Sequence, residues 1–340
     1  MKISSYNIAL EKVVKEIKEK NYKKILLQMP EGLKVYALDF LSFLEQETDA
    51  QFIVYSDPCF GACDIICSDV KEMDVDFIVQ IGHLPMPSLG GSSPPTMFIN
   101  AFVDFDVEKL VKRVIPKLEL KKIGLLSTAQ HVHLLDEVKE VLSEQDFEVF
   151  ISEGDRRIDS KGQVLGCNFS AANNLKDKVD MFLFIGSGNF HAMGLILSTK
   201  KPVVAVDPYT LEVKKEEIYD LRDMTLKQRY GAIASCRDVK KFGIIVGLKK
   251  GQERNNLAYD LKTLIESKGK KAVVFAMNHF SPQFLEGFRG INCFVSTSCP
   301  RIAIDDYIQY KIPIITPVEL KIILGIKKWE DFKFDEILNP

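Results

Sequence analysis

The ten residues KKILLQMPEG, Lys23 to Gly32, contain a basic pair, a short apolar run and a loop. The same order returns twice further along the chain, as KKIGLLSTAQ from Lys121 and as KKFGIIVGLKKG from Lys240. Short apolar runs of this kind are typical of strands that are buried on both faces of a parallel sheet. We interpret the three stretches as the first strands of three copies of one unit.

Each opening is followed by a segment with apolar residues at helical spacing, and then by three more apolar runs. The helical segments occupy residues 35–47, 131–145 and 255–269. The further strands are predicted, copy by copy, at 51–57, 75–83 and 95–102, at 146–152, 179–188 and 201–210, and at 270–278, 291–300 and 311–320. A four-stranded unit with a crossover helix is therefore repeated three times.

This repeat predicts an α/β fold of three related domains, each a small parallel four-stranded sheet with flanking helices, in a pseudo-threefold arrangement. We place the domains at 1–104, 105–212 and 236–340, with a charged helical connector at 213–235. The alternative is that any α/β protein has such a pattern, but four strands matching in the same order three times favour the repeat. Ligands bind beyond the carboxyl ends of parallel strands, so functional residues are expected in the loops after strands.

Charge and hydropathy exclude two classes of partner. The 340 residues include 45 basic and 47 acidic side chains, for a net charge of -2, which provides no positive surface for nucleic acid. The N-terminal residues are charged at short intervals, and no apolar run approaches the roughly 18 residues of a membrane span. We expect a cytoplasmic protein, whose seven cysteines are buried apolar residues or metal ligands rather than disulfides.

Three of these cysteines lie at four-residue intervals in DPCFGACDIIC, residues 57–67. The aspartate and proline at its start suit the first positions of a helix. On a helix, Cys59, Cys63 and Cys67 would spread over roughly 12 Å, too far for one cluster to reach both ends. The spacing is also one residue longer than the C-x3-C-x2-C motif of radical enzymes. We therefore expect this segment to supply only part of a metal site.

Two further cysteines follow strands in the other copies. Cys167, in VLGCNFSAANN, lies after the second strand of copy two, and Cys299, in STSCPR, lies after the third strand of copy three. Cys236 in the connector and Cys293 within a strand are expected in the core. One exposed thiol from each domain is thus predicted to converge where three sheet edges meet. Three thiolates suit either a zinc ion or a 4Fe-4S cluster with one free iron, and the spacing does not decide between them.

The motifs FGACD around Cys63, LGCN around Cys167 and STSCPR around Cys299 resemble those of the 2-(3-amino-3-carboxypropyl)histidine synthase family, which carries out the first step of diphthamide biosynthesis. The resemblance covers nearly the whole chain, and the compact length is similar to the archaeal, homodimeric form. It implies that these three cysteines hold a 4Fe-4S cluster. Cys59 and Cys67 depart from the family pattern as additional thiols, for which packing is the simpler role.

The resemblance also implies the chemistry. Enzymes of this family break the bond from sulfur to the methionine γ-carbon of S-adenosylmethionine, yielding a 3-amino-3-carboxypropyl radical and methylthioadenosine. The radical adds to imidazole C2 of a histidine on translation elongation factor 2, and an unidentified electron donor reduces the cluster. Which of three bonds breaks depends on orientation, so the protein is expected to act by positioning its cofactors.

A glycine-rich turn is the first candidate contact for S-adenosylmethionine. Gly186, Ser187 and Gly188 lie between a strand and a helical segment. A dinucleotide fingerprint needs a third glycine where this chain has His191, so nicotinamide binding is not predicted. The free amides of the turn suit a carboxylate such as that of the methionine moiety, with a tight turn without ligand as the alternative. His191 is included in this candidate set.

Gln130 and His133, after the first strand of copy two, are further candidates for the same pocket, with an exposed helix start as the alternative. His131 and His133 would point apart on a helix, so a shared metal is not expected. Arg301, in STSCPR, is expected to neutralise cluster charge or to pair with a carboxylate. The loop at 82–95 is expected to cover the site. No residue is assigned to removal of the imidazole C2 proton.

Two other classes of function remain open. One is a hydrolyase or condensing enzyme of the quinolinate synthase type, in which an open iron acts as a Lewis acid. The other is a non-catalytic zinc or iron-sulfur module that binds a partner protein. Cleavage of S-adenosylmethionine to methylthioadenosine distinguishes the radical transferase from both.

Overall fold

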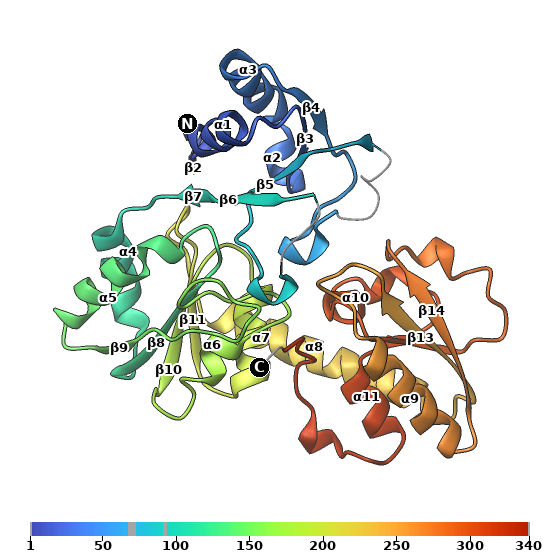
Figure 1. Ribbon diagram of the computed structural model, residues 1–340. Helices are drawn as coiled ribbons and strands as arrows, with labels where there is room; N and C mark the ends of the chain where they lie inside the picture. The colour runs from blue at the N-terminus through green and yellow to red at the C-terminus, as the bar shows by residue number, and fades with distance from the viewer. Residues whose placement is uncertain (1, 67–72, 91–93, 339–340) are drawn as a thin grey trace.

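The structure is a computed structural model that describes residues 2–66, 73–90 and 94–338. Three parallel sheets, each with its own helices, are arranged so that loops from all three meet near the middle of the molecule (Figure 1). The first unit is at the top of this view, the middle unit at the lower left and the third unit at the right. The predicted fold class is confirmed, whereas the exact domain boundaries remain a prediction.

The first unit contains a four-stranded parallel sheet in the order β4-β3-β5-β6. Its strands are β3 (Lys24–Gln28), β4 (Gln51–Val54), β5 (Phe77–Ile81) and β6 (Thr96–Ile99). Its helices are α1 (Leu10–Lys20), α2 (Glu31–Lys34) and the crossover helix α3 (Ala37–Glu47). A small antiparallel sheet, which the sequence analysis did not predict, is made of β1 (Lys2–Ile3), β2 (Tyr6–Ile8) and β7 (Ala101–Val103).

The middle unit has five strands in the order β12-β11-β10-β8-β9. They are β8 (Lys122–Ser127), β9 (Glu148–Phe150), β10 (Met181–Ile185), β11 (Val203–Val206) and the unpredicted antiparallel edge strand β12 (Val213–Lys214). Its helices are α4 (Val107–Val114), α5 (Leu135–Ser143), α6 (Ser170–Asn173) and α7 (Phe190–Thr199).

The third unit has the order β14-β13-β15-β16 and follows the long helix α8 (Glu216–Ser235), which forms most of the predicted connector. Its strands are β13 (Lys241–Gly247), β14 (Lys271–Met277), β15 (Cys293–Ser296) and β16 (Ile314–Ile315). Its helices are α9 (Asn255–Ser267), α10 (Arg301–Ile304) and α11 (Pro317–Ile323). Single turns of 3-10 helix lie at Ala62–Asp64, Pro87–Leu89, Ile115–Lys117, Val132–Leu134, Pro282–Phe284, Tyr307–Gln309 and Trp329–Asp331.

The three parallel sheets share one strand order. In each unit the second strand along the chain lies at one edge, followed by the first, the third and the fourth. All pairs within these four-strand sets are parallel. The carboxyl ends of each set therefore lie at one edge of its sheet, where ligands of open parallel sheets bind.

A packing detail is also repeated between the middle and third units. Gly124 in β8 is paired with Phe182 in β10, and Gly243 in β13 is paired with Phe294 in β15. A Cβ atom on Gly124 would lie 2.4 Å from the Phe182 ring, and one on Gly243 would lie 2.5 Å from the Phe294 ring. Glycine in the first strand thus makes room for an aromatic ring from the third strand.

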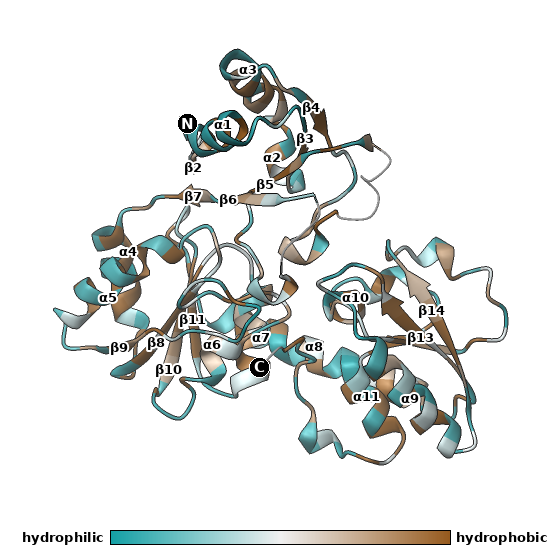
Figure 2. Ribbon diagram, viewed as in Figure 1, coloured by the Kyte–Doolittle hydropathy of each residue, from teal (hydrophilic) through white to brown (hydrophobic). Residues whose placement is uncertain are grey.

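Apolar strands form the centre of each unit and more polar helix faces surround them (Figure 2). The strand β10, MFLFI, is buried along its whole length, which is why it reads as an unbroken apolar run. None of the helices among the described residues combines the length and apolar character needed to cross a membrane.

Candidate metal centre

Cys63 lies in the loop that follows β4. The α-helix expected over this segment is wrong, because only Ala62–Asp64 form a 3-10 turn and Gly61 before them is extended. Proline and glycine, both poor helix formers, occupy positions 58 and 61 and keep the segment open. Cys59 and Cys63 therefore do not share a helical face, and Cys67 lies outside the described residues.

Cys59 is packed inside the first unit. Its side chain is only 2% exposed, and the Gln80 Nε2 donates a hydrogen bond to its Sγ at 3.0 Å. The Gln80 Oε1 lies 3.1 Å from the His83 Nδ1. Burial raises the pKa of Cys59 to about 12 and lowers that of His83 to about 4. These contacts agree with packing as the simpler role of this additional thiol.

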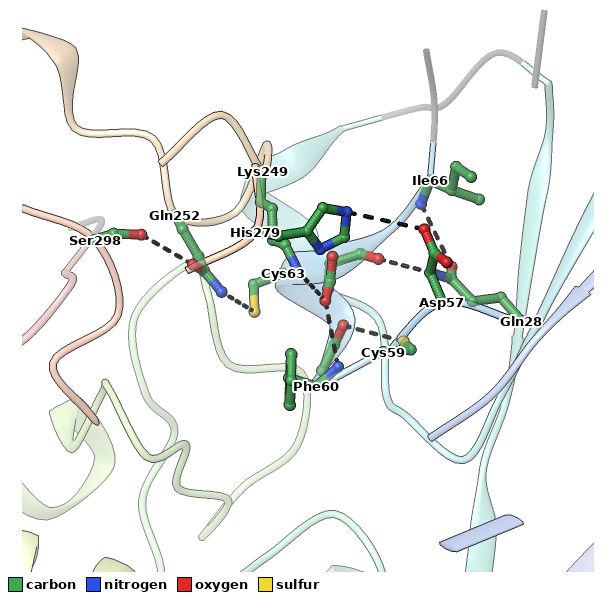
Figure 3. A network of polar contacts seen from close by, with 12 residues as sticks. Gln28, Asp57, Cys59, Phe60, Cys63, Ile66, Lys249, Gln252, His279 and Ser298 are labelled. Carbon is green, nitrogen blue, oxygen red and sulfur yellow. Dashed lines mark hydrogen bonds and ion pairs between the residues drawn. The ribbon is translucent and has the colours of Figure 1, made fainter. Parts of the chain in front are cut away.

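A loop of the third unit covers Cys63. The main-chain N–H of Gly251, after β13, donates to the Cys63 carbonyl at 3.1 Å. The Gln252 Nε2 donates toward the Cys63 Sγ at 3.4 Å, and the Ser298 Oγ donates to the Gln252 Oε1 at 2.9 Å. Figure 3 shows this row of side chains running from the third unit to the first. The Lys249 ammonium, from the same loop, forms an ion pair with Asp64 beside Cys63.

Cys167 lies in the long loop between β9 and α6 of the middle unit. Arg157, in the same loop, places its Nη2 2.8 Å from the Gly251 carbonyl and 4.0 Å from the Cys167 Sγ. The C-terminal segment crosses this loop, because the Ile337 N–H donates to the Cys167 carbonyl at 2.8 Å. Residues of the middle and third units therefore enclose Cys167.

Cys299 follows β15 and precedes the short helix α10. The Arg301 guanidinium lies over the Phe190 ring, 4.6 Å from its centroid, at the start of α7 in the middle unit. A Cβ atom on Gly166 would lie 3.2 Å from the Phe190 ring and 3.6 Å from the Arg301 Cδ. The Cys299 loop thus packs against the loop that carries Cys167.

The three thiols are electrostatic neighbours. The charge of Cys63 raises the pKa of Cys167, and the charges of Cys167 and Cys63 raise that of Cys299, in each case after a larger effect of burial. Burial, opposed by Arg157, brings the pKa of Cys167 to about 11, and it also raises the pKa values of Cys63 and Cys299. All three side chains are partly exposed, in contrast to Cys236 and Cys293, which are fully buried as expected.

In the described part of the chain, no three His, Cys, Asp or Glu side chains converge closely enough to hold a single metal ion. The structure nevertheless brings one thiol from each unit to a common region at the carboxyl ends of the sheets. Their assignment as ligands of one cluster remains a proposal.

The glycine-rich turn lies beside this region. Gly186, Ser187 and Gly188 connect β10 to α7, and Gly188 has a positive φ of 81°. His191, in the first turn of α7, stacks on Phe184 with the ring centroids 5.8 Å apart. Burial, followed by the charge of Arg301, lowers the pKa of His191 to about 4. His191 and Arg301 are therefore close neighbours, as a shared pocket requires.

Gln130 and His133 have partners of a different kind. The Gln130 carbonyl accepts from the Val103 N–H, and the His133 Nε2 lies 2.8 Å from the Asp104 Oδ1. These contacts join the middle sheet to the small antiparallel sheet. Among the residues that the structure describes, no hydrogen bond or ion pair links either side chain to the three cysteines, so their role in the pocket stays a prediction.

Sequence reasoning missed four polar side chains near the thiols: Arg157, Lys249, Gln252 and Arg254. All four follow strands of the parallel sheets, in GDRR after β9 and in KKGQER after β13. Two charged clusters in loops at the carboxyl edge were the available signal. The Arg254 guanidinium donates to the Ser298 carbonyl at 3.2 Å and forms an ion pair with Asp335 at 2.6 Å.

Gly251 provides a test of the contact over Cys63. A Cβ atom on Gly251 would lie 2.4 Å from the Cys63 Cα and 3.0 Å from its carbonyl oxygen, so Gly251→Ala forces the two loops apart. We expect the variant to lose about 1–3 kcal/mol of unfolding free energy and to retain less iron after reconstitution. Iron content and thermal unfolding measure both effects.

The matched control is Gly287→Ala in the same unit, where an added Cβ meets nothing within 4 Å. This variant should match the wild type in both assays. A Gly251→Ala protein with wild-type iron content and stability would show that the two loops do not pack as described.

Comparisons with known proteins identify the family. A sequence profile described as "Putative diphthamide synthesis protein" matches residues 29–333. The chain is 38% identical to 2-(3-amino-3-carboxypropyl)histidine synthase of Pyrococcus horikoshii, over 98% of this chain and 94% of that protein. It is 30% identical to the protein of the same name from Methanocaldococcus jannaschii, over 98% of this chain and 93% of that one.

Among solved structures, Dph2 from Pyrococcus horikoshii with a 4Fe-4S cluster superposes with a TM-score of 0.89 at 36% sequence identity, covering 98% of this chain and 94% of that chain. The fold and the length of the match agree. The chain therefore belongs to the diphthamide synthesis family.

Proposed function

We propose that this protein transfers a 3-amino-3-carboxypropyl group from S-adenosylmethionine to imidazole C2 of a histidine on translation elongation factor 2, at a 4Fe-4S cluster. This reaction is the first step of diphthamide biosynthesis. The proposal includes three partners: the elongation factor as substrate, a second copy of the chain in a homodimer, and an electron donor. It places the reaction in the cytoplasm. The observation that carries the proposal is the convergence of Cys63, Cys167 and Cys299 from three related units.

The names of the relatives support the reaction, and the Pyrococcus structure with its 4Fe-4S cluster supports the cofactor. The donor set of this chain also fits. Three partly exposed thiols come from three separate sheets, and three irons of such a cluster accept one thiolate each while a fourth stays open. The Nε of the buried Arg157, next to Cys167, has no hydrogen-bond partner among the described residues, which suits a site that contains an anion.

In the proposed reaction, one electron enters the sulfonium and the bond from sulfur to the γ-carbon breaks. The carbon fragment leaves as a radical and the sulfur stays in methylthioadenosine. After the radical adds to imidazole C2, the ring becomes aromatic again by losing one electron, which the oxidised cluster would take back, and one proton, which would pass to water. When bound, the cluster would supply the electron and an open iron to which the cosubstrate is held.

The protein's own residues would orient the reactants. Gly186, Ser187, Gly188 and His191 at the start of α7, with Arg301 facing them, are the proposed contacts of the methionine moiety. The low pKa of His191 keeps the imidazole neutral near pH 7, so Arg301, whose Nε already pairs with Asp305 at 2.7 Å, is the cation beside it that would contact a carboxylate through its other nitrogens. Gln252 and Arg157 would donate toward the sulfurs of Cys63 and Cys167, and the enclosing loops would limit access of water.

One anaerobic experiment tests the proposal. The protein is reconstituted with iron and sulfide, reduced with dithionite and mixed with S-adenosylmethionine, and the products are separated by chromatography. We expect methylthioadenosine, because the proposed orientation exposes the γ-carbon bond to reduction. Addition of elongation factor 2 should then shift that protein's mass by one 3-amino-3-carboxypropyl group.

Other products would point elsewhere. Formation of 5′-deoxyadenosine would indicate ordinary radical chemistry at a different bond. Absence of cleavage by a fully reconstituted and reduced cluster would contradict the proposal and favour a Lewis-acid enzyme or a binding module. Elongation factor 2 in which the substrate histidine is replaced by alanine serves as the control for the transfer step.

A further inference from the structure

Arg157 is a buried cation beside the thiols without a carboxylate partner. Only 6% of the residue is exposed, and its Nε has no hydrogen-bond partner among the described residues. Its Nη2 contacts the Gly251 carbonyl and the Cys167 sulfur. None of the ion pairs in residues 2–66, 73–90 and 94–338 includes this guanidinium. The nearby Asp155 carboxylate accepts instead from the Arg157 main-chain N–H at 2.9 Å and from the Asn168 Nδ2 at 2.9 Å.

The other cations that act on the three thiols are neutralised within the described structure. They pair as Lys249 with Asp64, Arg254 with Asp335 at 2.6 Å, and Arg301 with Asp305 at 2.7 Å. Arg157 differs from all three because it has no carboxylate partner among the described residues, although Lys249 is as deeply buried and only Arg301 has half of its side chain exposed to water. Among the described residues, Arg157 is therefore the cation of the site that has no ion pair, and it is located at the contact between the units.

A buried cation without a counter-ion is costly, so its presence indicates that an anion completes the site. The sulfur of Cys167 is 4.0 Å away, and the charge of Arg157 acts on both Cys63 and Cys167. The same guanidinium donates a hydrogen bond to the Gly251 carbonyl, while the Gly251 N–H donates one to the carbonyl of Cys63. One side chain thus contacts the cysteine loop of the middle unit and the loop that covers the cysteine of the first.

We infer that Arg157 is a positioning residue that compensates the negative charge of the cysteine-bound iron-sulfur cluster and thereby makes the cluster easier to reduce. The inference rests on the proposed function, because it needs the cluster to be held by these thiols. A positive charge near the sulfurs stabilises the state with one more electron, and net charge and hydrogen bonds to sulfur are what set cluster potentials. Arg157 would in this way help to provide the electron that the cleavage of the sulfonium requires.

The test is a redox titration of reconstituted Arg157→Gln, followed by electron paramagnetic resonance of the reduced cluster. At a fixed solution potential, we expect the ratio of reduced to oxidised cluster to fall at least about tenfold, which is 59 mV for a one-electron couple. Arg157→Lys keeps the charge and should recover most of the ratio. Arg156→Gln removes the same charge from the neighbouring exposed side chain and should leave the ratio unchanged.

Thermal unfolding of the cluster-free proteins separates an effect of the lost charge on the cluster from an effect of the substitution on folding. If Arg157→Gln loses its cluster but unfolds at the wild-type temperature without it, while Arg157→Lys keeps the cluster, the positive charge is needed for retention, which supports the charge compensation on which the inference rests. An intact cluster with the wild-type potential in Arg157→Gln would overturn it. A potential lowered equally by Arg156→Gln would also overturn it, since a general surface charge would then be responsible.

Failure of the proposed function can be distinguished from failure of the inference about Arg157. If the wild type takes up no cluster, the proposed function is wrong and the inference falls with it. If the wild type takes up a cluster but does not cleave S-adenosylmethionine, the reaction is wrong while the potential of Arg157→Gln still decides the role of this residue.

Discussion

Replacing any one of Cys63, Cys167 and Cys299 by alanine is expected to lower the amount of iron bound after reconstitution at least about tenfold. A loss of this size already follows when a residue that only hydrogen-bonds to a metal ligand is replaced. Each of the three thiols comes from a different unit, so none of the other two can take over its position. Iron and sulfide assays, visible absorbance and electron paramagnetic resonance of the same samples measure the loss. Cleavage of S-adenosylmethionine should disappear with the cluster.

Two cysteines of the same chain serve as controls. Cys236 is fully buried in the core of the third unit beside Cys293, and Cys59 is buried beneath Gln80 in the first unit. Alanine at either position removes a thiol without removing one of the three proposed ligands, so the iron content should stay at the wild-type level. Loss of the cluster in Cys236→Ala together with its retention in Cys167→Ala would show that the ligand assignment is wrong.

The inner strands of the parallel sheets could be predicted because they are buried on both faces, as β10 and β11 are along their whole length, which leaves an unbroken apolar run in the sequence. The strand order could not be read from the runs themselves, since their pairing depends on contacts between distant segments. The strands β1, β2 and β12 were missed for a related reason, and β7 was merged with β6 in the single strand predicted at 95–102. The missed strands are two or three residues long and belong to the small antiparallel sheet or, in the case of β12, to a sheet edge, so they carry neither a continuous apolar run nor a clear alternation.

The cysteine positions could be predicted from their place after strands, and the structure brings the three loops together. The local shape around Cys63 could not, because an aspartate followed by a proline suits a helix start while Gly61 and the covering loop at 248–252 determine the actual turn. Arg157 was equally hard to recognise. Its importance lies in the absence of a carboxylate partner among the described residues, which only three-dimensional contacts reveal.

The junction between α8 and the third unit contains a buried ion pair. The Arg229 guanidinium donates two hydrogen bonds to the Glu319 carboxylate, both at 2.6 Å, and the two side chains are 1% and 0% exposed. Arg229 also donates to the carbonyls of Ala303 and Ile314, while Glu319 accepts from the Thr316 N–H and completes the capping box of α11. Every strong polar group of the pair is therefore satisfied by the other or by the backbone.

Arg229→Met is expected to lower the free energy of unfolding of the third unit by about 3–5 kcal/mol, because it leaves the Glu319 carboxylate buried without a counter-charge. The ring of Trp329, the only tryptophan of the sequence, has its centroid 5.2 Å from that of Tyr230, which follows Arg229 on α8. Tryptophan fluorescence therefore reports denaturant unfolding at this junction. Glu319→Gln should be similarly destabilising, since it leaves the guanidinium uncompensated.

The matched control on the same helix is Arg222→Met, whose partner Asp223 is exposed, and its effect should be below about 1 kcal/mol. Combining Arg229→Met with Glu319→Gln should cost less than the sum of the two single changes, because neither unpaired charge is then left in the core. Strictly additive losses would mean that the two groups contribute independently and that their pairing does not fix α8 to the third unit. A coupling of several kcal/mol would instead identify this ion pair as the main polar contact that joins the connector helix to the domain carrying Cys299.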